Sequence, residues 1–113
     1  LLAKDVKQDS GRPVGVLTGG PLTEEYHVVQ IHWHWGRTSS EGSEHTYKGQ
    51  NFPMEMHIVH GKKSLLYLDD DLAKALTTVD GLSVTGFQFE IDVNRHLNTS
   101  KTTLTFNGLN INL

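Results

Sequence analysis

The run Tyr26–Trp35 constrains the fold more than any other segment of this 113-residue chain. β-Branched and aromatic residues dominate it and Gly36 follows it, which is typical of a strand that ends in a turn. Because successive side chains of a strand point to opposite faces, this run has two distinct faces. The apolar face, which we expect to pack in the core, carries Val29, Ile31, Trp33 and Trp35. The other face carries Val28, Gln30, His32 and His34.

Shorter runs of similar character predict further strands along the chain. These runs are Val14–Leu17, Phe52–His60, Ser64–Leu68, Leu82–Ile91, Thr102–Phe106 and Leu109–Leu113. Turn formers lie between most of them: Gly61-Lys62-Lys63 is expected to turn the chain, and Asn107-Gly108 is a hairpin dipeptide. The acidic residues 69–71 predict the start of a single short helix over Leu72–Leu76. The pattern predicts a mainly β fold with a largely antiparallel sheet.

Composition narrows the classes of function. Ten basic and thirteen acidic residues give a net charge of -3, and no basic block is present, so we expect no nucleic-acid partner. No run of about 18 apolar residues occurs, so we expect no transmembrane segment. The chain has no cysteine, so any metal must be held by His, Asp or Glu. The alternating end at Asn110–Leu113 and the missing initiator Met lead us to expect a partial domain.

Histidines are in excess, with seven in the chain, and their spacing predicts a metal site. His32 and His34 share one strand face with Cα atoms roughly 6.6 Å apart, so their rings can converge on one ion. His57, on the next predicted strand, can complete a three-histidine Zn²⁺ site that leaves one coordination position open for water. Gln30 and Glu55 each lie two residues before a ligand on the same face, so they can accept hydrogen bonds from the non-ligating ring N–H groups.

The remaining histidines are expected to be structural or on the surface. His27 lies on the face opposite the pair, where we expect a structural or solvent-exposed ring. His60 points away from His57 and is expected to be a hydrogen-bonded core residue. His96 falls in the weakly patterned tail, where we expect surface.

Five blocks of the chain follow one another in a family-like order and spacing. They are Gly19-Gly20-Pro21-Leu22, Gln30–Gly36, Gly42-Ser43-Glu44-His45-Thr46, Glu55–His60 and Asp80–Gly86. In these blocks, which cover about Leu17 to Glu90, the sequence resembles the α-class carbonic anhydrases. The resemblance implies the central portion of a large, mostly antiparallel twisted sheet with small helices, in a partial domain that lacks its N-terminal and C-terminal segments.

The resemblance also assigns roles to individual residues. The implied zinc ligands are His32, His34 and His57, with Gln30 and Glu55 as the acceptors that hold their rings. Glu44 corresponds to a glutamate that orients a gatekeeper threonine, which lies downstream of this chain in the family. His45 is implied to be structural. Val59 and Val84 match an apolar wall where carbon dioxide waits beside the metal.

The implied activity is the zinc-dependent, reversible hydration of carbon dioxide to bicarbonate and a proton, the carbonate dehydratase reaction of a lyase that serves pH regulation. Leu1–Asp5 offers no histidine as a proton shuttle, and the tail from Asp92 departs from the family pattern. The alternatives are a catalytically impaired binding or matrix module of biomineralisation, or a truncated piece that does not fold. The sequon Asn98-Thr99-Ser100 favours a secreted or extracellular location. The sequence does not define an oligomeric state.

Overall fold

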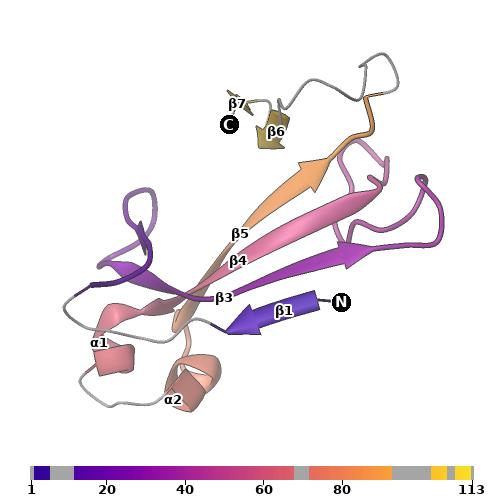
Figure 1. The fold of residues 1–113 in the computed structure, drawn as a ribbon. Helices are drawn as coiled ribbons and strands as arrows, with labels where there is room; N and C mark the ends of the chain where they lie inside the picture. Colours follow the sequence, from indigo (N-terminus) through magenta and orange to yellow (C-terminus); the bar gives the residue numbers. More distant parts are fainter. Residues whose placement is uncertain (1, 6–11, 68–71, 93–102, 107–108, 113) are drawn as a thin grey trace. The chain divides into compact units, whose positions relative to one another are not determined.

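The computed structural model describes residues 2–5, 12–67, 72–92, 103–106 and 109–112 (Figure 1). Among them are seven strands and two short helices. In chain order they are β1 (Leu2–Asp5), β2 (Val16–Leu17), β3 (Tyr26–Trp35), β4 (Met54–Lys62), α1 (Lys63–Tyr67), α2 (Leu72–Thr77), β5 (Leu82–Phe89), β6 (Thr103–Phe106) and β7 (Leu109–Asn112).

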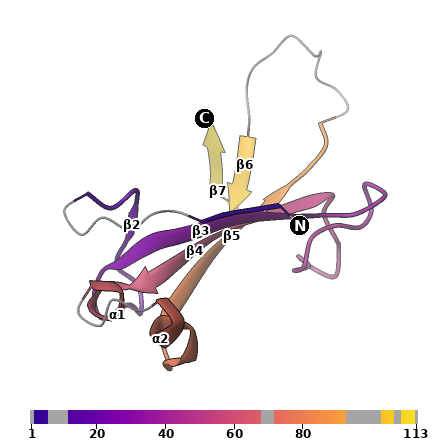
Figure 2. The same ribbon diagram turned by 60° about the horizontal axis from the view of Figure 1, so that its bottom comes forward.

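The strands form one sheet in the order β1-β3-β4-β5-β6-β7, with β2 paired to β3. The registers of β2 with β3, of β5 with β6 and of β6 with β7 are all antiparallel. Figure 2 shows β6 and β7 running in opposite directions. In their register Leu104 lies opposite Ile111. The mainly antiparallel sheet with small helices confirms the predicted fold class. The predicted hairpin strands are also present, although residues 107–108 lie outside the described part of the chain.

Strand β3 has the bounds predicted for it, but the turn predicted at Gly61-Lys62-Lys63 is wrong. Strand β4 continues to Lys62, and helix α1 begins at Lys63. The backbone N–H of Lys62 donates to Gly81 O at 2.9 Å, and that of Lys63 donates to Glu25 O at 3.0 Å. These distant acceptors pair the last N–H group of the strand and the first of the helix, so the chain passes from β4 into α1 without a turn between them.

The strand predicted over Ser64–Leu68 is also wrong, since its described residues, Ser64–Tyr67, lie in helix α1. The Glu24 carboxylate accepts a hydrogen bond of 2.7 Å from the backbone N–H of Ser64, in the first turn of the helix. Leu66 of α1 is buried and packs against Gly61, where a Cβ would lie 2.8 Å from the Leu66 side chain. The described part of the chain therefore contains two helices where one was predicted. Helix α2 matches the prediction, while residues 69–71 lie outside the described part.

The chain forms two compact units, one containing Trp33–Met56 and the other Ala3–His32 and His57–Thr85. Among the residues whose burial is described, the buried apolar side chains all lie in the second unit, and they are Tyr26, Val28, Val29, Leu66 and Ala75.

The prediction that only one face of β3 packs in the core needs correction. Val28 and Val29 point to opposite faces and both are buried, because Gly15 packs against Val28 with a site for Cβ only 3.0 Å from its Cγ2 atom. At the other end of the strand, Trp35 is 51% exposed. Both faces are thus covered where β3 begins, and the predicted apolar face is open where β3 ends.

Candidate metal centre

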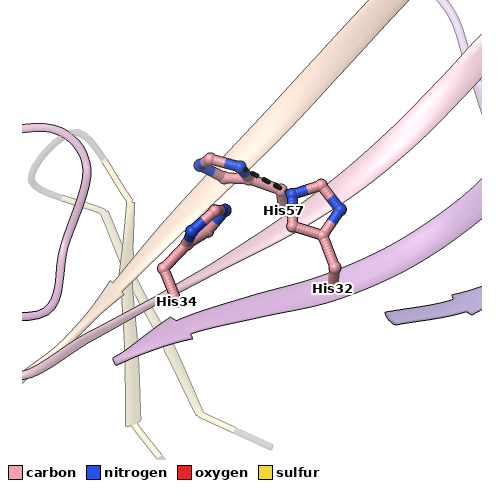
Figure 3. A group of neighbouring side chains, drawn as sticks. All are labelled: His32, His34 and His57. Atoms are coloured by element: carbon pink, nitrogen blue, oxygen red, sulfur yellow. Dashed lines mark hydrogen bonds between the residues drawn. The ribbon is translucent and has the colours of Figure 1, made fainter. Parts of the chain in front are cut away.

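Three imidazoles come together from strands β3 and β4. His32 and His34 lie on the same face of β3 because they are two residues apart, and His57 lies on β4. Each offers a ring nitrogen, and these nitrogens lie within 4.8 Å of one another. Figure 3 shows the three rings turned toward a common point. The structure thus brings together the three residues that the sequence predicts as metal ligands.

The spacing of the ring nitrogens fits a tetrahedral zinc ion. His32 Nε2 and His57 Nδ1 lie 3.2 Å apart, and the two rings are inclined at 80°. Zn–N bonds of about 2.0–2.1 Å at a tetrahedral angle separate two ligand nitrogens by about 3.3–3.4 Å. Neutral imidazoles are among the ligands that zinc prefers, and three of them without a fourth protein ligand are typical of a catalytic rather than a structural zinc site.

The His32 ring is held by Gln30, as the spacing of the two residues predicts. Gln30 Oε1 accepts a hydrogen bond of 2.9 Å from His32 Nδ1. This contact favours the tautomer in which the proton is on Nδ1, so the lone pair of Nε2 points toward the other two rings.

Glu55 makes contacts that its position in the strand could not indicate. Its side chain is 2% exposed, and Oε2 accepts hydrogen bonds from the backbone N–H groups of Glu44 at 3.1 Å and His45 at 3.2 Å. His45 Nδ1 lies 3.0 Å from the same oxygen. A carboxylate oxygen of Glu55 also lies within 4.8 Å of a ring nitrogen of His57, so its role as acceptor for that ring stays a prediction. Glu55 ties the loop segment Glu44-His45 to strand β4.

The two loop residues have different surroundings. Glu44 Oε2 lies 3.3 Å from His34 Nε2, and the Glu44 side chain is 52% exposed. The His45 side chain is 73% exposed. The hydrogen bond with Glu55 and the negative charge of Glu55 raise the pKa of His45. These contacts support a structural role for His45. The position of Glu44 beside His34 is a contact that sequence spacing did not indicate.

The other described histidines are buried and engaged. His27 is 2% exposed, with Nδ1 at 3.0 Å from the Tyr67 hydroxyl and Nε2 at 3.2 Å from Glu25 Oε2. It is thus a structural residue, one of the two alternatives expected for it. His60 Nδ1 donates to Ser83 O at 3.2 Å, and burial lowers the pKa of His60. This environment matches the predicted hydrogen-bonded core residue. His96 lies outside the described residues.

The two valines predicted to line a carbon dioxide pocket have moderate to high exposure. Val59 is partly buried on β4, and Val84 is 52% exposed on β5. Two cavities of about 490 and 510 Å³ lie elsewhere, one beside Phe52 and Pro53 and one beside Glu24 and Tyr67. Neither is lined by Val59 or Val84, and their role as a substrate wall stays a prediction.

A mainly antiparallel sheet presents three convergent imidazoles, so the chain is a β-sheet protein with a candidate histidine metal site. Residues 4–110 match the family described as eukaryotic-type carbonic anhydrase, and the chain belongs to that family.

Individual relatives agree with the family match. The chain is 43% identical to human carbonic anhydrase 7 over 77 residues, which cover 66% of the chain and 27% of that protein. It is 41% identical to rabbit carbonic anhydrase 1 over 61% of the chain and 28% of that protein. It is 34% identical to mouse carbonic anhydrase 1 over 74% of the chain and 31% of that protein. The chain thus spans less than a third of the length of these relatives. None of the helices in the described segments is long and apolar enough to cross a membrane.

Proposed function

We propose that this chain carries the zinc centre of an enzyme that reversibly hydrates carbon dioxide to bicarbonate and a proton. The observation that carries the proposal is the convergence of His32, His34 and His57, at a nitrogen spacing that suits tetrahedral zinc. Family membership supports the same reaction. Because the chain spans less than a third of its relatives, the activity is proposed for the protein that contains this region.

Zinc held by three imidazoles lowers the pKa of a coordinated water to about 7, a value established for carbonic anhydrases in general rather than a property read from this chain. The residues of this chain hold and orient the site. His32 Nε2 and His57 Nδ1 face each other as ligand atoms, and Gln30 fixes the His32 ring. Glu55 holds the segment that places the Glu44 carboxylate beside His34.

The apolar side of the substrate site is proposed to include Val59 and Val84. Carbon dioxide carries no charge and is weakly hydrated, so an apolar wall holds it beside the metal without competing for a coordination position. Val59 lies two residues after His57, on the same face of β4.

The test is stopped-flow hydration of carbon dioxide together with measurement of bound zinc. His57→Ala removes one ligand and should abolish both tight zinc binding and zinc-dependent hydration. His27→Gln is the matched control, because His27 is a buried histidine with its own partners outside the ligand set. Equal hydration rates for the protein that contains this region with and without His57→Ala would contradict the metal assignment. One equivalent of bound zinc without any hydration would instead support the non-catalytic binding module.

A further inference from the structure

The loop segment Gly42–His45 is fixed to Phe52 and Pro53, the two residues that precede β4. Ser43 N donates to Phe52 O at 2.9 Å, and Phe52 N donates to Ser43 Oγ at 2.8 Å. Gly42, with φ of 141°, lies so close to Pro53 that a Cβ would be 2.1 Å from the Pro53 carbonyl oxygen. These contacts hold the first half of the segment in place and leave the orientation of Glu44 and His45 to other groups.

Both peptide groups that flank the His45 Cα atom have a side-chain partner. On one side, the His45 N–H donates to buried Glu55, which also accepts from Glu44 N. On the other side, the His45 carbonyl accepts a hydrogen bond of 2.7 Å from Gln88 Nε2, on strand β5. This distance is at the short end of the range for N–H···O hydrogen bonds. These two hydrogen bonds restrain the peptide planes on both sides of the Cα atom, and with them the φ and ψ angles of His45.

We infer that Gln88 is a positioning residue for the metal centre, acting through the His45 carbonyl. By holding this carbonyl, Gln88 keeps the N–H groups of Glu44 and His45 directed at Glu55 and the Glu44 carboxylate 3.3 Å from His34 Nε2. The inference rests on the proposed function only where it assigns Glu44 a part in catalysis. Gln88 is distant in sequence from the segment that it holds, so no local motif marks it.

The experiment measures backbone amide exchange in the metal-free chain, followed by titration with Co²⁺. Gln88→Met keeps the length of the side chain and removes the donor. Gln88→Lys retains a donor, and Gln50→Met on the exposed loop is the matched control. Losing one hydrogen bond of ordinary net strength should speed exchange of the Glu44 and His45 amides about two- to tenfold in Gln88→Met. The apparent dissociation constant for Co²⁺ should rise by a similar factor, with an altered visible spectrum.

Gln88→Lys should keep the slow exchange of the Glu44 and His45 amides and the Co²⁺ spectrum of the unchanged chain. Gln50→Met should change neither the exchange nor the spectrum. Unchanged exchange of the two amides in Gln88→Met would overturn the inference. A uniform rise across all amides would overturn it as well, because that pattern marks general destabilisation. If Gln88→Met does not fold, the near-isosteric Gln88→Glu variant must show the localised increase. Absence of carbon dioxide hydration by the protein that contains this region would refute the proposed function and leave the exchange result standing.

Discussion

The buried carboxylate of Glu55 gives the sharpest test of how the centre is held together. Glu55→Gln keeps the shape of the side chain and removes its charge. A hydrogen bond to a charged group contributes about 1.5–3 kcal/mol, against about 0.5–1.5 kcal/mol for a neutral pair. For the two backbone donors, Glu44 N and His45 N, the difference is about 2 kcal/mol. Burying a neutral amide costs less than burying a carboxylate, so we expect a net loss of about 1–2 kcal/mol in the free energy of unfolding.

The His45 ring adds little to this loss, because its side chain is 73% exposed and water screens its ion pair. The assay is urea unfolding at neutral pH, followed by the fluorescence of Trp33 and Trp35 on β3. Glu90→Gln, at an exposed carboxylate, is the control and should change stability by less than about 0.5 kcal/mol. If Glu55→Gln is no more destabilising than Glu90→Gln, the charge of Glu55 does not anchor the loop segment Glu44-His45.

Three further results are expected. Gly42→Ala should destabilise the chain by at least about 1–3 kcal/mol in thermal unfolding, because Gly42 has a φ of 141° and an added Cβ would clash with Pro53. The control Gly49→Ala should cost less, because a Cβ at Gly49 meets no atom within 4 Å. Equal losses for the two variants would contradict the clash. Zinc at a hundredfold excess over its dissociation constant should stabilise the chain by about 2.7 kcal/mol, and His34→Ala should remove this gain. Burial lowers the pKa of His60 from 6.5, so the contribution of His60 to stability is present above pH 6.5 and is lost as the pH falls through the lowered pKa. In urea unfolding between pH 7.5 and 5, His60→Gln should therefore lose less stability on acidification than the unchanged chain.

Local periodicity was enough to predict the part of the site that lies on strands. The β-branched and aromatic residues of Tyr26–Trp35, followed by Gly36, predict the bounds of β3. The two-residue spacing of His32 and His34 predicts their shared face. Placing His57 opposite them required only that the next long strand pair with β3, which the sheet order bears out. These inferences depend only on spacing within single strands and on one strand pairing. They therefore do not require knowledge of the rest of the fold.

What sequence could not supply comes from contacts between residues far apart in the chain. Helix α1 lies where a strand was predicted, and its first turn is stabilised by the Glu24 carboxylate, 40 residues away, which accepts from Ser64 N. Trp35 is exposed at the end of β3. Alternation predicts which side chains share a face of the strand but not whether another element covers that face. The anchoring of His45 by Glu55 and Gln88 depends on the path of a loop, and loop paths carry no periodic signal.

His32 and His57 face each other through different ring nitrogens, and this difference has a consequence for any redesign of the centre. His32 meets its neighbour through Nε2, whereas His57 presents Nδ1. Nε2 lies as many bonds from Cβ as the side-chain amide of glutamine, and Nδ1 as many as that of asparagine. The nearest amide mimics are therefore His32→Gln and His57→Asn, and exchanging these two substitutes would misplace each donor atom by one bond along the side chain.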